Sequence, residues 1–144
     1  MKYRKAAEKE KIRFLSGPAR LDRKIGLDLE RLSALREYAS SVRSSPLGEK
    51  VASSGTGEAR FTDIVGKICE LEQLIDEETD KLVDLKSEIS EAIDSLADYE
   101  EQTVLYFKYV FNLSFAQIAE KMLVSKYKAF TLHESAISHI KIPK

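Results

Sequence analysis

Few residues of the 144-residue chain have the types and spacing that catalysis or metal binding requires. His133 and His139 are six positions apart, so on one helix they point to different faces and cannot share a metal as an i, i+4 pair could. Cys69 has no His–acid arrangement beside it, and next to Ile68 we expect it to pack partly buried. The carboxylates of residues 70–101 lie along one helix and are typical of a solvated face. The sequence therefore predicts no enzyme, no metal and no cofactor.

The side chains best suited to binding lie in the last predicted helix, which starts after Ser125 and runs to about Ile140. Ala129, Leu132 and Ala136 share one face of this helix and should pack inward. The opposite face is polar and partly basic, as a surface that meets a nucleic acid backbone must be. Any soluble protein carries similar residues on its surface helices, so a purely structural role remains open.

On the outward face, Lys126 and Lys128 are the predicted phosphate contacts, at the start of the helix. Tyr127 and Thr131 are candidates to reach base edges, whereas Glu134 either accepts a hydrogen bond from a cytosine amino group or repels phosphate. We expect one copy to bind DNA weakly, because the basic residues are few. The complete predicted DNA-contacting set is Lys126, Tyr127, Lys128, Thr131, Glu134, Ser135, Gln117 and Lys121, the last two from the preceding helix.

Two shorter helices must position this face. Ser114 and Gln117 have capping-box spacing, which predicts a helix through Met122, followed by a tight turn at 123–124. The helix lengths and the short turn are those of a helix-turn-helix.

A supporting helix is predicted before them. Asp98 and Glu101 have the same capping-box spacing and open a helix near Tyr99 that ends at 112–113. Its apolar residues nearly surround it, as expected for the central helix of a small bundle.

The strongest periodic signal begins at Phe61 and alternates spacings of three and four. This pattern over five heptads predicts a coiled-coil seam. Glu78 either fixes the register of the seam or marks where the first helix runs out, and we prefer the second explanation. The seam positions are Phe61, Ile64, Ile68, Leu71, Ile75, Glu78, Leu82, Leu85, Ile89, Ala92 and Leu96.

An earlier helix is predicted to start at 17–18, with Ser16 as its candidate cap, and to end before a loop at about 44–60. Since this helix is shorter than the long one, a hairpin leaves part of the seam uncovered. Either the C-terminal segment or a second protomer covers the remainder, and a homodimer through the seam is the preferred prediction. The apolar stripe of the first helix is Leu21, Ile25, Leu29, Leu32, Leu35, Ala39 and Val42.

Charge is distributed in blocks along the chain. Residues 1–44 carry 12 Lys and Arg against 6 Asp and Glu, residues 61–101 carry 3 against 14, and residues 102–144 carry 6 against 2. Either the basic helix pairs with the acidic one or the acidic face binds a partner, and the sequence leaves both open. No apolar run is long enough to span a membrane, and the opening segment lacks the apolar stretch of a signal peptide.

The segment 105–137 resembles region 4 of bacterial sigma factors, with Leu-Ser at 113–114, Ile-Ala at 118–119 and Val-Ser at 124–125. About 125 residues resemble small regulators from prophages of Gram-positive bacteria, which join a basic helix, a loop and a long acidic helix to such a region. Further matches to that family are Leu82-Val83-Asp84-Leu85-Lys86, Leu105-Tyr106-Phe107-Lys108-Tyr109 and Leu132-His133-Glu134-Ser135-Ala136-Ile137.

The resemblance implies a late-gene transcription regulator that binds promoter-proximal DNA, with host RNA polymerase as a second partner. Two features depart from the family. Leu123 stands where Gly usually precedes Val-Ser, which costs about 1 kcal/mol if the backbone keeps positive φ. The recognition helix also lacks the usual Arg residues.

Together these observations predict an all-α protein with a helical hairpin or coiled-coil arm over 1–97 and a helix-turn-helix over 98–144. The predicted function is that of a DNA-binding phage transcription regulator in the bacterial cytoplasm, with double-stranded DNA as partner and no membrane association. Two alternatives remain: a helical module that contacts RNA polymerase or another protein without touching DNA, and a small DNA-packaging subunit.

Overall fold

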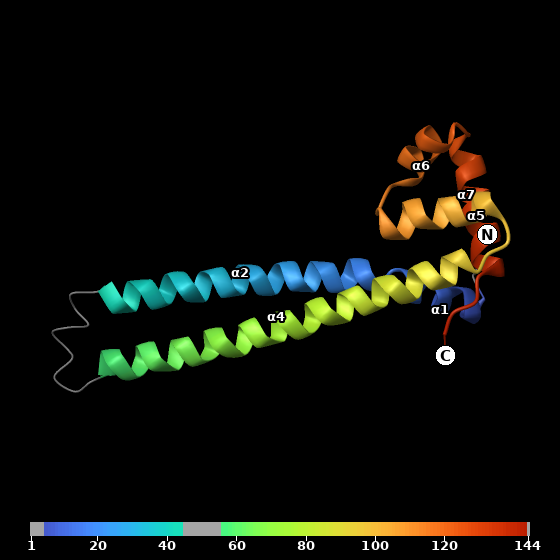
Figure 1. Cartoon of the computed structure of the whole chain (residues 1–144). Coiled ribbons are helices and arrows are strands. Elements are labelled where there is room, and N and C mark those ends of the chain that lie inside the picture. The colour runs from blue at the N-terminus through green and yellow to red at the C-terminus, as the bar shows by residue number, and fades with distance from the viewer. Residues whose placement is uncertain (1–4, 45–55, 144) are drawn as a thin grey trace. The chain divides into compact units, whose positions relative to one another are not determined.

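The computed structural model describes residues 5–44 and 56–143, which are helical or irregular and contain no strand (Figure 1). The predicted all-α class is therefore confirmed. The chain forms two compact units, one from residues 22–81 and the other from the residues on either side of that segment. Two helices, α2 (Gly17–Ser44) and α4 (Thr56–Asp94), contribute to both units.

Within the unit of residues 22–81, α2 and α4 lie side by side and run antiparallel (Figure 1). The long helix starts at Thr56, so the prediction of a loop as far as residue 60 is wrong for 56–60, and residues 45–55 lie outside the described part of the chain. All eleven predicted seam positions, which lie on α4 except for Leu96 just after it, are buried or half-buried. The heptad pattern therefore identified the face on which α4 packs.

The facing stripe on α2 differs from the prediction at one position. Leu29 is 49% exposed, whereas Asp28 is fully buried. With Asp28 in place of Leu29, the α2 stripe alternates spacings of four and three as regularly as its partner does. The prediction selected the apolar neighbour, but helix geometry places the carboxylate in the seam.

Asp28 and Glu78 form a charged layer inside the hairpin. The ammonium group of Lys24 lies 2.7 Å from Oδ2 of Asp28 and 2.8 Å from Oε2 of Glu78. Arg31 Nη1 donates to Oδ1 of Asp28 at 2.8 Å, whereas Oε1 of Glu78 is buried without a hydrogen-bond partner. Glu78 thus faces α2, so the preferred prediction that it marks the end of the first helix is wrong.

The other unit begins with a helix that the sequence analysis did not identify, α1 (Ala6–Leu15). Ser16 was expected to cap α2, but its hydroxyl instead donates to the carbonyl oxygen of Ile12 at 2.7 Å. Its backbone keeps helical dihedral angles (φ −82°, ψ −5°), whereas a capping residue must be extended. From α1, Lys11 donates to the carbonyl oxygen of Ile137 at 3.0 Å.

The core of this unit joins α1, the end of α4, α5 (Tyr99–Leu105), α6 (Phe115–Met122) and α7 (Lys126–His139). Its largest fully buried side chains are Leu15, Ile89, Ile93, Leu105, Ile118, Ile137 and Ile140. The chain's own helices thus cover the end of the α4 seam. The uncovered seam that motivated the predicted homodimer is therefore absent from the described structure.

The predicted helix over 99–112 consists of α5 followed by a turn of π-helix, η2 (Tyr106–Val110). Asp98 caps it by accepting from the backbone N–H groups of Glu100 and Glu101. The side chain of Glu101 does not complete the predicted capping box. It is buried and instead accepts a hydrogen bond from Ser135 at 2.6 Å, which ties α5 to α7.

The turn between α6 and α7 has the geometry that a Schellman motif requires. The N–H of Val124 donates to the carbonyl of Ala119 at 3.0 Å, and the N–H of Leu123 donates to that of Glu120 at 3.4 Å. Leu123 is left-handed (φ 58°, ψ 44°) and 91% exposed. The strained conformation anticipated from the missing glycine is present, with little side-chain contact to offset it.

Asp28 makes the stability of the hairpin depend on acidity. The hydrogen bond from Lys24, with those involving Glu78 and Arg31, lowers the pKa of Asp28 from its ordinary value of 3.8 to about 2. Since the folded pKa lies below the unfolded one, the ionised carboxylate stabilises the fold above about pH 4, and this contribution disappears as the pH falls through about 2. We expect Asp28→Asn to lower the free energy of unfolding at neutral pH. The difference from the wild type should shrink as the pH falls from about 4 to about 2.

Urea denaturation followed by circular dichroism measures this difference at each pH. The matched control is Asp63→Asn, because the Asp63 side chain is 69% exposed and forms an i, i+4 pair on the same hairpin. A difference between the wild type and Asp28→Asn that stays constant with pH would contradict the assignment.

The left-handed Leu123 gives a second prediction. Leu123→Gly should raise the free energy of unfolding by up to about 1 kcal/mol, because glycine relieves the left-handed strain but loses more entropy on folding. Thermal unfolding measures the change. The control, Leu27→Gly, also replaces an exposed leucine but within α2, where it should destabilise by about 1 kcal/mol. Equal losses at both positions would refute the prediction.

Candidate nucleic-acid interface

Two capped helices, α6 and α7, build the candidate surface. Ser114 accepts from the N–H of Gln117 at 3.2 Å, and the Gln117 side chain accepts from the N–H of Ser114 at 2.9 Å, so the predicted capping box is complete. Ser125 then caps α7 by accepting from the N–H of Lys128 at 3.0 Å. These caps place the first turn of α7 directly after the Schellman turn.

The inner face of α7 packs as predicted. Ala129, Leu132 and Ala136 are all buried in the core of the unit. His133 is also buried, with Nε2 2.7 Å from the hydroxyl oxygen of Tyr109 and its ring edge-on to Phe115. His133 is thus a buried packing residue of α7.

Three of the predicted DNA-contacting residues share the exposed first turn of α7. Lys126, Tyr127 and Lys128 are exposed, and Tyr127 is 78% accessible. Backbone N–H groups and the positive end of the helix dipole are concentrated in such a turn, so anions bind favourably there. Two lysines at the same place add charge, and the tyrosine ring offers an apolar and hydrogen-bonding surface between them. The turn is chemically suited to a phosphate backbone.

The other three candidates on α7 are less available. Thr131 is half-buried and its hydroxyl donates to the carbonyl of Lys128 at 2.9 Å. The Glu134 carboxylate lies 2.9 Å from Nδ1 of His133, and Ser135 donates to Glu101. The prediction that Ser135 looks outward is therefore wrong, because a buried carboxylate on α5 requires its hydroxyl as a donor.

The two candidates on α6 are both exposed. The Gln117 side chain is held in the capping box, while Lys121 lies in the last turn of the helix. Only Lys121 therefore adds a cation from α6 to those of the α7 turn.

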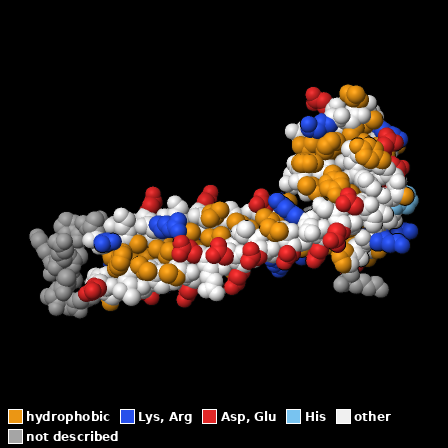
Figure 2. Space-filling view, viewed as in Figure 1, with side chains coloured by type: hydrophobic (Ala, Val, Ile, Leu, Met, Phe, Trp, Pro, Cys, Tyr) orange, Lys and Arg blue, Asp and Glu red, His pale blue; other side chains and the backbone are white. Residues whose placement is uncertain are grey.

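Leu123 and Phe130 were not among the predicted contacts, yet both are exposed next to the lysines. Phe130 packs edge-on against Phe115 with ring centroids 5.6 Å apart. Phe130 could have been identified from its spacing. It lies four residues after Lys126, and residues four apart are neighbours on one face of a helix. Figure 2 shows hydrophobic side chains gathered on the visible face of this unit.

The cysteine at position 69 is exposed on α4, so the expectation that Cys69 packs partly buried is wrong; it lies just outside the seam. Among residues 5–44 and 56–143, no group of three His, Cys, Asp or Glu side chains is arranged to hold a metal ion. None of the described helices is sufficiently long and apolar to cross a membrane.

Comparisons with known proteins give one match. The segment 42–141 matches the family described as "Protein of unknown function (DUF1492)". No curated protein and no solved structure matches the chain. The matched segment includes all of α4, α5, α6 and α7, so it contains the candidate interface. Since the match covers more than half of its residues, the chain belongs to the DUF1492 family.

Proposed function

We propose that this protein is a phage transcription regulator that binds double-stranded DNA with the first turn of α7. The observation that carries the proposal is the exposure of Lys126, Tyr127 and Lys128 together at a capped helix start. The resemblance of segment 105–137 to region 4 of bacterial sigma factors supports it. No step of this proposal needs a metal or cofactor.

The proposed contacts have separate roles. Lys126 and Lys128 neutralise phosphates, and Lys121 adds a third phosphate contact from α6. Tyr127 is the side chain of this turn that best reaches a base edge, because it is long, exposed and able to donate or accept. Ser135 and Glu134 are withdrawn from direct contact, since both make hydrogen bonds within the protein.

A second candidate function is contact with RNA polymerase or another protein. The observation that favours it is the row of acidic side chains along α4, many of them visible in Figure 2. Such a surface repels DNA and attracts a basic protein face. The two functions are compatible, because a regulator can bind DNA through one surface and polymerase through another.

Charge reversal at the first turn of α7 tests the DNA proposal. We expect Lys126→Glu combined with Lys128→Glu to weaken binding to a mixed-sequence duplex and to reduce the slope of log K against log salt by about two, one for each lost phosphate contact. Fluorescence anisotropy of the labelled duplex between about 50 and 200 mM salt measures both quantities.

The matched control is Lys81→Glu combined with Lys86→Glu, which makes the same charge change on exposed positions of α4. Equal weakening by the two double variants would show that only net charge matters and would overturn the assignment to α7. A wild-type protein that does not bind at the lowest salt would overturn DNA binding itself.

A further inference from the structure

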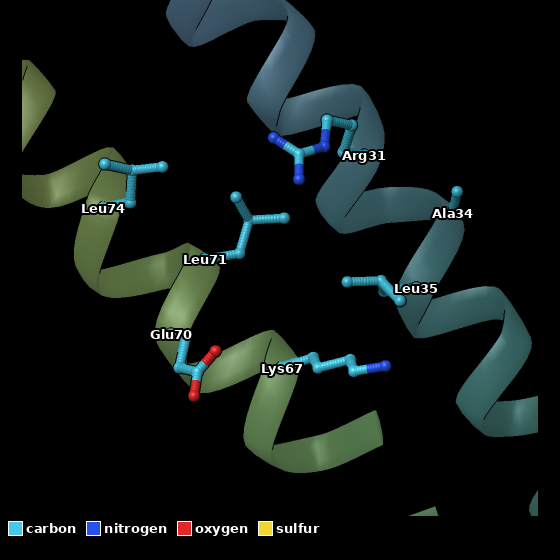
Figure 3. Close-up of a pocket in the computed structure, with 7 residues that line it drawn as sticks. All are labelled: Arg31, Ala34, Leu35, Lys67, Glu70, Leu71 and Leu74. Atoms are coloured by element: carbon cyan, nitrogen blue, oxygen red, sulfur yellow. The ribbon is translucent and has the colours of Figure 1, made fainter. Parts of the chain in front are cut away.

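Two cations on the flank of the α2–α4 hairpin are already paired within the hairpin. Arg31 and Lys67 line a groove of about 520 Å³ between the two helices (Figure 3). Arg31 Nη1 lies 2.8 Å from Oδ1 of Asp28, and Lys67 Nζ lies 3.5 Å from Oδ2 of Asp63. Both positive charges are therefore satisfied within the fold.

Lys108 of η2 differs from these cations because its neighbours are aromatic. Its ammonium group lies 4.5 Å from the centroid of the Phe115 ring, which is a cation–π contact between η2 and α6. In the described part of the chain, no Asp or Glu forms an ion pair with Lys108. An ammonium group has three N–H donors, so those directed away from the ring can bind an anion.

Two exposed phenylalanines belong to the same cluster, and each packs on an inner ring. Phe130 of α7 lies edge-on to Phe115 with ring centroids 5.6 Å apart. Phe111, directly after η2, packs on Phe107 with centroids 6.0 Å apart. The inner rings are half-buried against the core, whereas Phe111 is 60% exposed and Phe130 38%. We call Phe107, Lys108, Phe111, Phe115 and Phe130 the aromatic–lysine surface.

The chemistry of this surface fits an unpaired nucleic acid strand. Exposed rings offer faces on which bases stack, and lysine neutralises the neighbouring phosphates. The bases of a duplex are already stacked on one another, so only an unpaired strand presents free base faces to such rings. An apolar protein face would instead bury Lys108 without an anion, at a desolvation cost.

The aromatic–lysine surface continues into the cationic first turn of α7. Phe130 lies four residues after Lys126, and residues four apart are neighbours on one face of a helix. A strand that crosses the surface would therefore meet lysines on both η2 and α7. This continuity favours a polyanion over a small ligand.

We propose that the aromatic–lysine surface binds single-stranded DNA, with bases stacked on Phe111 and Phe130 and a phosphate held by Lys108. This contact is additional to the duplex contact of the first α7 turn, and the choice of DNA over RNA rests on the proposed function. Every base has a π-face, so the surface selects unpaired strands and not a sequence. A regulator with both contacts prefers duplex DNA that adjoins an unpaired segment.

Fluorescence anisotropy of a labelled oligo(dT) strand of about 12 nucleotides, titrated with the full chain, tests the proposal. Phe111→Ala and Phe130→Ala should each raise the dissociation constant by about fivefold or more, because each removes a ring that stacks on a base. Neither ring is buried in the core, and circular dichroism establishes that the helices remain. The control Tyr99→Ala removes a ring that is 78% exposed in the same unit but lies between Asp98 and Glu100. It should change the affinity by less than about twofold.

An abasic strand of the same length separates stacking from a general loss of structure. It keeps the phosphates but has no bases, so Phe111→Ala should leave its affinity unchanged, and Phe111→Tyr should retain the binding of oligo(dT). Lys108→Gln should instead reduce the slope of log K against log salt by about 0.7 for both strands. The control Lys141→Gln, at an exposed position after α7, should leave the slope unchanged.

Four outcomes would each overturn the proposal. They are no binding of oligo(dT) by the wild type at about 50 mM salt, equal losses for Phe111→Ala and Tyr99→Ala, an equal loss on the abasic strand, and tighter binding of oligo(U) than of oligo(dT). Duplex binding measured in parallel keeps the two proposals apart, because Phe111→Ala should leave it within about twofold. Failure of duplex binding alone overturns the proposed function, and failure of single-strand binding alone overturns this inference.

Discussion

A heptad stripe along α4, apolar at every position except Glu78, supplies part of the core of both compact units. Over residues 61–78 the stripe packs against α2, and from residue 89 onward its side chains join the core made by α1, α5, α6 and α7. Because every seam position is covered, α4 is buried along one face for its whole length and solvated along the other. A helix of 39 residues is stable in this arrangement, since packing of the amphipathic face and not intrinsic propensity stabilises it.

The charged layer within this stripe has a specific physical consequence. Asp28 is fully buried and tolerated only because Lys24 and Arg31 hold both of its oxygens, and Glu78 shares the Lys24 ammonium group. Burying an ion pair seldom adds stability compared with an apolar pair of the same size. It does penalise other registers: sliding α2 by one heptad would place Asp28 against an apolar layer. We infer that this layer fixes the pairing of the hairpin, which the apolar positions alone specify less strictly.

Two of the surfaces considered for binding use different physics. The first turn of α7 combines a helix dipole with two exposed lysines, which favours a polyanion, whereas the row of acidic side chains along α4 favours a basic protein face.

The sequence alone determined the helical class, the inward face of α4 and the caps at Ser114 and Ser125, because each depends on residues within one or two helical turns. The left-handed conformation of Leu123 was conditional on the family resemblance, since a leucine does not itself favour it, and the structure established it. Only the tertiary structure decided which residue of α2 entered the seam and where Glu101 turned its carboxylate. Asp28 is buried because Lys24, Arg31 and Glu78 meet it there, and Glu101 leaves its capping position because α7 offers Ser135 and His139. Local pattern rules assign charged residues to the surface, and burial becomes favourable only when packing supplies polar partners. For Asp28 these are Lys24 and Arg31 on its own helix, with Glu78 sharing Lys24 across the seam, and for Glu101 they come from α7.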